Sequence, residues 1–141
     1  MKISARDEYA CAAVLELALN YDAETPVRVQ DIAQRHEIPM KFLFQIMQIL
    51  KRVDIVKSRR GTEGGYSLSR APGQITVGDV IRALRGPVDG PFVQVSIADS
   101  GQFADIWSEV DRAIGGVLNN ITFEELVRRT RANQRHLMYH I

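Results

Sequence analysis

Hydrophobic residues recur at three- and four-residue spacings through most of the first 85 positions, which places them on one face of an α-helix. The pattern predicts four helices, over residues 5–20, 29–35, 39–53 and 74–85. Two pairs, Ser4 with Asp7 and Thr76 with Asp79, have the spacing of a capping box, in which side chains satisfy the free backbone N–H groups at a helix start. We therefore expect a mainly α-helical chain.

The third predicted helix, residues 39–53, has one apolar and one polar side. The polar side carries Lys41, Gln45, Gln48 and Arg52. Glutamine can form two hydrogen bonds with adenine, and lysine or arginine can bind guanine. Because a short turn joins this helix to the preceding one, the two have the order of a helix-turn-helix, and the polar side is a candidate DNA-reading face. The alternative is an ordinary solvated face.

Residues Ile55–Leu68 predict a β-hairpin directly after that helix, because two short β-type runs flank a glycine-rich turn. The glycines, which permit the backbone conformations of a tight turn, are Gly61, Gly64 and Gly65. The cations near the turn are Lys57, Arg59 and Arg60, and only Glu63 opposes them. A hairpin of this kind can lie along a phosphate backbone. Together with the preceding helices it predicts a winged helix-turn-helix and a DNA partner.

The C-terminal part follows a different pattern. Its apolar residues alternate in steps of four and three, as in a heptad seam: Phe103, Trp107, Val110, Ile114, Val117 and Ile121. One helix cannot bury such a stripe alone, so it must pack on the rest of the chain or on a second copy. Thr122 with Glu125 predicts the start of a final helix.

Three regions follow from these patterns. Residues 1–86 are the expected winged helix-turn-helix domain, and residues 102–141 are the expected dimerisation helix and C-terminal helix. Residues 87–101 read as a linker that holds at most a short strand around Val93–Ile97.

Charge supports the nucleic-acid interpretation. The formal net charge of the 141 residues is only +1, but residues 35–60 hold seven Lys or Arg and two Asp or Glu, a net charge of +5. No acid–base pair, nucleophile elbow or phosphate-binding loop can be read, so we do not expect an enzyme. The sequence has no signal segment and no apolar run long enough to span a bilayer, which predicts a cytoplasmic protein.

Cys11 is the one cysteine, so no intrachain disulfide or cysteine-based metal cluster can form. Its apolar neighbours favour a buried structural thiol over a redox sensor. His136 and His140 have the spacing of a metal pair, but no third ligand is apparent nearby, and solvated side chains are the expectation.

Several segments together resemble one family. They are the opening MKIS, Tyr9-Ala10, Ile32-Ala33, Ile38-Pro39 with Phe42-Leu43, SRRGTEGGY over residues 58–66, and Ile75-Thr76 with Asp79-Val80-Ile81. Over nearly its whole length the chain resembles the Rrf-two (Rrf2) family of bacterial winged helix-turn-helix transcription regulators. The resemblance implies homodimers that cross through a long C-terminal helix. It also implies a pseudo-palindromic operator in double-stranded DNA, with the third helix in the major groove and the wing in the minor groove.

At matching positions the resemblance implies DNA contacts by Lys2 and Ser4 near the backbone, Lys41 and Gln45 on the third helix, and Arg60 at the wing. A guanidinium suits the narrow, electronegative minor groove of AT-rich DNA, which makes Arg60 the strongest candidate. The full expected DNA-binding set adds Gln48, Arg52, Arg59, Gly64 and Tyr66. The expected dimer seam is the set Phe103, Trp107, Val110, Ile114 and Val117.

The chain departs from the family pattern in two places. Several members carry a glutamate for cytosine readout where this chain has Phe44, so we expect a different operator. Sensor members hold an iron-sulfur cluster with three cysteines in the segment that matches residues 86–106, and this chain has none there. It is most similar to the cluster-free branch, whose signal comes through a complex with cysteine synthase.

That enzyme accepts partner C-termini that end in isoleucine, and this chain ends with Tyr139-His140-Ile141. Tyr139 and Ile141 are therefore candidate contacts for such a partner. Two functions from different classes follow: a dimeric DNA-binding repressor without a cofactor, and a regulatory module that docks its tail into an enzyme. An ordinary frayed terminus is the alternative for the tail.

Overall fold

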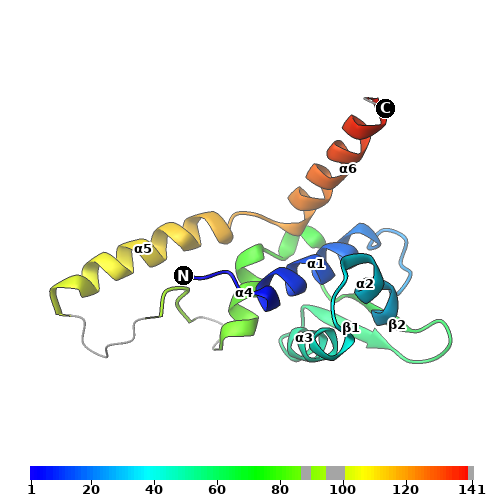
Figure 1. The fold of residues 1–141 in the computed structure, drawn as a ribbon, viewed down its shortest axis with the longest axis horizontal. Coiled ribbons are helices and arrows are strands. Elements are labelled where there is room, and N and C mark those ends of the chain that lie inside the picture. The colour runs from blue at the N-terminus through cyan, green and yellow to red at the C-terminus, as the bar shows by residue number, and fades with distance from the viewer. Residues whose placement is uncertain (87–89, 95–100, 140–141) are drawn as a thin grey trace.

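Six α-helices and one β-hairpin make up the part of the chain that the computed structural model describes, residues 1–86, 90–94 and 101–139. In chain order they are α1 (Ala5–Leu19), α2 (Val29–His36), α3 (Met40–Arg52), β1 (Val56–Arg59), β2 (Gly65–Leu68), α4 (Val77–Arg85), α5 (Ala104–Leu118) and α6 (Phe123–Tyr139) (Figure 1). The predicted mainly helical fold with a small hairpin is confirmed. Of the short strand expected around Val93–Ile97, residues 95–97 lie outside the described residues, and Val93 and Gln94 form no strand.

The core is built around α1, which packs against α2, α3, α4, α6 and β2. Its apolar face supplies Ala10, Ala13 and Val14, each with no exposed surface. α3 contributes its predicted stripe, Leu43, Ile46, Met47 and Leu50, all of them fully buried. Close packing of these side chains fixes α3 against the body, so the opposite side of α3 is directed to solvent.

Local sequence signals set the helix ends as expected. Ser4 caps α1 and Thr76 caps α4, each in a complete capping box with Asp7 and Asp79. The fourth helix begins at Val77 rather than at Gln74, because Pro72–Gln74 forms a separate 3₁₀ turn before the cap. Since a cap must lie outside its helix, the prediction of Thr76 as the cap was right and the prediction of Gln74 as the start was wrong.

An ion pair joins the first and fourth helices. Arg85 donates a hydrogen bond of 2.6 Å to the carboxylate of Asp7, whose side chain is only 3% exposed, and a second one of 2.9 Å to the carbonyl of Lys2. A buried carboxylate without a cationic partner would be costly, so this pair fixes the N-terminal turn of α1 beside the end of α4.

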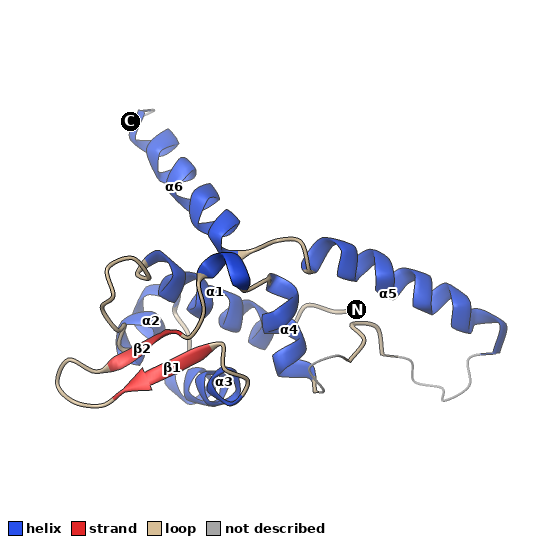
Figure 2. Ribbon diagram, turned by 180° about the vertical axis from the view of Figure 1, so that it is seen from behind, coloured by secondary structure: helices blue, strands red, loops and turns tan. Residues whose placement is uncertain are grey.

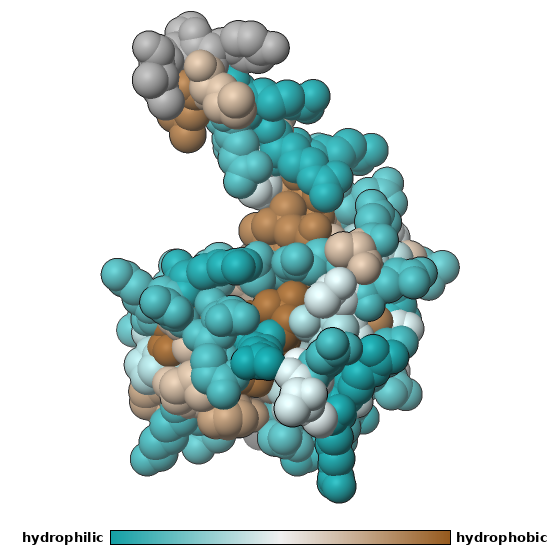
Figure 3. All heavy atoms as spheres, turned by 90° about the vertical axis from the view of Figure 1, so that its right-hand side faces the viewer, coloured by the Kyte–Doolittle hydropathy of each residue, from teal (hydrophilic) through white to brown (hydrophobic). Residues whose placement is uncertain are grey.

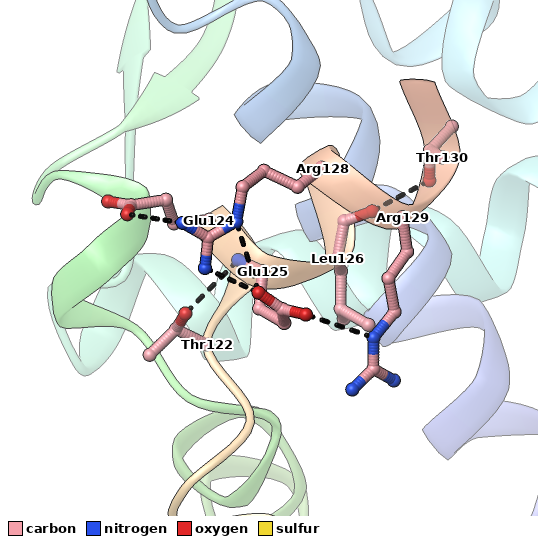
Figure 4. Close-up of polar contacts among 7 residues, drawn as sticks. All are labelled: Thr122, Glu124, Glu125, Leu126, Arg128, Arg129 and Thr130. Atoms are coloured by element: carbon pink, nitrogen blue, oxygen red, sulfur yellow. Dashed lines mark hydrogen bonds and ion pairs between the residues drawn. The ribbon is translucent and has the colours of Figure 1, made fainter. Parts of the chain in front are cut away.

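The last helix begins inside the domain and then leaves it. Phe123 is fully buried, and its backbone N–H donates to Ile75 at 3.0 Å. Thr122 accepts a hydrogen bond from Glu125, whose carboxylate binds Arg128 and Arg129 on the next turn (Figure 4). The Arg128 guanidinium holds the pKa of Glu125 below its usual range. The rest of α6 projects from the body (Figures 1 and 2).

The fifth helix extends from the body and has no buried residue (Figure 2). One of its contacts with its own chain runs through Phe92, which is 4% exposed and lies under the guanidinium of Arg82 at 5.1 Å. The N–H of Val93 donates to Asp111 at 2.9 Å, and the Phe92 ring approaches Gly115. α5 continues through Gly115 and Gly116 without a break.

Candidate nucleic-acid interface

The outward side of α3 carries all four polar residues that the sequence predicts for it. Lys41, Gln45, Gln48 and Arg52 are exposed, and we call this set the recognition face. It lies opposite the buried stripe of the same helix, as a helical period of about 100° per residue requires. The donors of the recognition face are therefore free to meet a large ligand that approaches α3 from solvent.

A tight turn orients α3 against α2. Glu37 ends α2 in a left-handed conformation, with φ 54°. Ile38 is buried, and its N–H donates to Ala33 at 3.0 Å, after which Pro39 is the N-cap residue of α3. This connection is the turn of the helix-turn-helix, and it leaves the recognition face clear of α2.

The hairpin after α3 is an antiparallel pair in register from Val56 opposite Leu68 to Arg59 opposite Gly65. We call residues 56–68 the wing. Gly61 has φ 109°, and a side chain at Gly64 would lie 2.2 Å from the carbonyl oxygen of Arg59. The turn therefore needs glycine at both positions. Lys57, Arg59 and Arg60 are exposed, as Glu63 is at the tip.

Two backbone hydrogen bonds attach the wing to the segment before α2. Val27 and Tyr66 each donate an N–H to the carbonyl of the other, both at 2.8 Å. Arg28 reinforces the attachment, because its guanidinium donates to the carbonyl of Thr62 near the wing tip. A side chain at Gly65 would lie 2.5 Å from the Val27 oxygen. The sequence did not predict these roles of Val27 and Arg28, because one isolated β-bridge leaves no repeating pattern of apolar residues in the sequence.

The candidate cations have no acidic partner in the part of the chain that the structure describes. Within the described residues, no ion pair involves Lys41, Arg52, Lys57, Arg59 or Arg60, whereas Arg35, Arg82, Arg85, Arg128 and Arg129 all have acidic partners. An unpaired surface cation can bind a phosphate without first losing a protein partner. The side of the molecule that carries the wing is largely hydrophilic (Figure 3).

The remaining predicted DNA-binding residues lie outside the recognition face and differ in how exposed they are. Lys2 and Ser4 are exposed at the N-terminus, and Ser4 already accepts a hydrogen bond from Asp7 as the cap of α1. Gly64 is half-buried at the turn. Tyr66 is only 9% exposed and belongs to the hydrophobic core. The structure thus brings the recognition face and the wing together, and it gives Tyr66 a place in the support beneath them.

The predicted dimer seam forms an exposed apolar stripe on α5. Phe103, Trp107, Val110 and Val117 are between 39% and 58% exposed, Ile114 is half-buried, and the Phe103 and Trp107 rings stack at 6.3 Å. Ile106, 46% exposed, extends the stripe and was missed because it lies outside the strict heptad spacing. An exposed apolar patch of this kind is typical of a protein interface.

Cys11 does not offer a reactive thiolate. Burial and the nearby Asp7 carboxylate raise the pKa of its thiol to about 11. Among the described residues, no group of three or more His, Cys, Asp or Glu is arranged to hold a metal ion. Iron-sulfur clusters require thiolate ligands, and the chain has one cysteine, so its residues do not fit such a cluster.

A helix-turn-helix, a basic wing and the clear recognition face define a winged helix-turn-helix DNA-binding protein. The sequence matches the Rrf2 family, described as an iron-dependent transcriptional regulator, over residues 3–129. The chain belongs to the Rrf2 family, a family of transcriptional regulators and not of enzymes. No helix of the described residues is long and apolar enough to cross a membrane.

Two relatives show how far the similarity extends. The chain is 34% identical to the HTH-type transcriptional regulator CymR of Bacillus subtilis, over 100% of both chains. It is 36% identical to the regulator IscR of Cronobacter sakazakii, over 90% of this chain and 80% of that one.

Solved structures of two regulators have a fold similar to that of this chain. The structure of CymR, the global cysteine regulator of B. subtilis, matches with a TM-score of 0.77 and 32% identity, over 92% of this chain and 98% of that one. The structure of T. potens IscR matches with a TM-score of 0.80 and 32% identity, over 95% and 91%.

The wing attachment can be tested with Gly65→Ala. The new side chain would collide with the Val27 carbonyl, so we expect unfolding to become easier by about 2 kcal/mol and exchange of the Val27 and Tyr66 amides to accelerate. Gly61→Ala is the matched control, because its backbone also has positive φ but nothing lies within 4 Å of the new atom. Hydrogen exchange read by NMR would compare them. Equal exchange rates in the two variants would contradict the attachment.

Proposed function

We propose that two copies of this chain bind a pseudo-palindromic operator in double-stranded DNA and repress transcription. The observation that carries the proposal is the set of unpaired cations on α3 and the wing, next to two exposed glutamines on the same helix. The recognition face enters the major groove, where glutamine and lysine suit base edges. The wing follows the backbone into the adjacent minor groove, and the protein acts in the cytoplasm, where bacterial DNA lies.

Each predicted residue has a role in this arrangement. Lys41, Gln45 and Gln48 meet base edges, and Arg52, Lys57 and Arg59 meet phosphates. Arg60 enters the minor groove, whose negative potential favours a guanidinium. Lys2 and Ser4 approach the backbone, while Gly64 shapes the turn and Tyr66 supports the wing from the core.

The dimer forms through the apolar stripe of α5. Residues 1–86 then act as the DNA-binding domain, residues 87–101 as the linker, and residues 102–141 as the dimerisation region. The proposed dimer has no cofactor, because the chain lacks the thiolates that the cluster of a sensor member needs. Regulation must therefore come from a different signal than a cluster in this chain.

Arg60→Ala tests the wing. We expect operator affinity to fall about tenfold or more, because each dimer loses two minor-groove contacts. The dependence of affinity on salt should also become less steep, since fewer phosphate-bound ions are released. Fluorescence anisotropy over a salt series would measure both. Arg131→Ala, on exposed α6, is the matched control and should change affinity less than twofold. Full operator affinity in Arg60→Ala would contradict the proposed wing contact.

Trp107→Glu tests the dimer. A charge placed in the apolar stripe would have to be buried without a partner on association, so we expect the molar mass in light scattering to fall from about twice 15.9 kDa to 15.9 kDa. Arg112→Glu, exposed on another side of α5, is the control and should remain dimeric. Affinity for a two-half-site operator should fall with Trp107→Glu, while affinity for a single half-site is kept. A dimeric Trp107→Glu would disprove the seam.

A second function has an observation in its favour. α6 projects from the body, and near its end Leu137 and Met138 are 63% and 77% exposed (Figure 1). We infer a regulatory docking site for cysteine synthase in which Tyr139 and Ile141 take part. Ile141 and the side chain of Tyr139 lie outside the described residues.

Deletion of Ile141 tests this docking. The deletion removes the isoleucine side chain and moves the terminal carboxylate back to His140. Binding to purified cysteine synthase, measured by calorimetry, should therefore weaken at least tenfold. Operator affinity should stay as in the parent, and Arg131→Ala again serves as the control. Unchanged binding to the enzyme after the deletion would exclude the tail as the contact.

A further inference from the structure

Two phenylalanines on α3 are exposed, and they flank the recognition face on opposite sides. Phe44 is 48% exposed and Phe42 is 44% exposed. At about 100° per residue, Phe44 lies one turn from both Lys41 and Gln48, on their side of the helix. Phe42 lies about 100° away from Lys41, at the edge of the buried side. Phe44 is therefore an apolar ring at the border of the recognition face, beside the hydrogen-bonding groups of Lys41 and Gln48.

Phe44 also borders the wing. It lines a shallow hollow together with Arg28 and Gln30 at the start of α2 and with Arg59 and Thr62 of the wing. Arg28 is held there by its hydrogen bond to the Thr62 carbonyl, so the hollow has a fixed wall. The ring thus lies between Arg59 of the wing on one side and the donors of α3 on the other.

The charges near Phe44 indicate which kind of ligand can pack on its ring. An apolar protein partner would have to bury the nearby Lys41 and Arg59 charges, which have no acidic partner in the described chain. DNA laid along α3 would match these charges with phosphates instead. In the major groove, the apolar group that a base pair offers is the C5-methyl group of a pyrimidine, which thymine carries and cytosine lacks.

We propose that Phe44 is a specificity-determining residue that packs on the C5-methyl group of a thymine in each operator half-site. This inference rests on the proposed function. The ring has no hydrogen-bonding atom, so it selects by shape and by exclusion of water. Cytosine at that position has no methyl group, so the Phe44 ring would stay hydrated. Its amino group would also face the ring, which offers no hydrogen-bond acceptor. Thymine is therefore preferred to cytosine at one position of each half-site.

The test replaces each thymine of the operator with uracil, which removes only the methyl group. The operator is first selected with the parent protein from a random DNA library. We expect one symmetric pair of replacements to weaken parent binding about five- to thirtyfold, since two methyl contacts are lost. Phe44→Ala should bind the thymine and uracil operators equally. Phe42→Ala, the matched control, should keep the parent's preference, and Phe44→Leu should keep part of it.

The outcomes separate the two proposals. If the parent enriches no DNA sequence, the DNA-reading function itself fails. If the parent binds but no thymine-to-uracil pair matters, or if Phe44→Ala keeps the full preference, the Phe44 inference alone is overturned. A purely structural role of Phe44 at the wing would weaken both operators equally in Phe44→Ala while leaving the preference intact. Methyl dependence seen only when a cytosine of the site is replaced by 5-methylcytosine would also overturn the assignment to thymine.

Discussion

The position of the wing depends on the two backbone hydrogen bonds between Val27 and Tyr66. A two-stranded hairpin is at best marginally stable alone, so β1 and β2 need a third partner to hold one orientation. Val27 supplies it from the segment just before α2, and the absence of a side chain at Gly65 permits the approach. Because α2 begins just after Val27 and ends in the turn to α3, the two ends of this helix contact the wing and α3. A surface fixed in this way loses little conformational freedom when it binds.

A second constraint is that the chain leaves part of its apolar surface uncovered. α5 touches its own domain through the region of Phe92 and Asp111, while most of its apolar stripe stays exposed. The stripe runs along a helix that extends from the body (Figure 2). A second copy that packs on it would place two recognition faces at a fixed separation. The geometry of α5 would thereby determine the spacing of the two half-sites.

The helices and caps were predictable because their signals are local. The capping boxes of Ser4 and Thr76 and the buried stripe of α3 each appear within one or two turns of sequence. The Val27–Tyr66 bridge was not predictable, since it joins residues far apart in the chain. Tyr66 was expected at the DNA, but its side chain lies in the core beside Leu68, on the face of β2 that strand alternation directs inward, a local signal that the sequence does carry. The contacts assigned to individual DNA-binding residues stay predictions.

The net charge of +5 over residues 35–60 is a poor measure of the charge available to DNA. Arg35 contributes to it, yet its guanidinium binds the buried carboxylate of Glu16 at 2.9 Å. The two acids that lower the sum, Glu37 and Asp54, both follow helix ends with φ of 54° and 60°. They occupy the left-handed positions that end α2 and α3, away from the middle of the recognition face. The field that a phosphate meets therefore comes from the unpaired cations, and the acids subtract from it only at the edges.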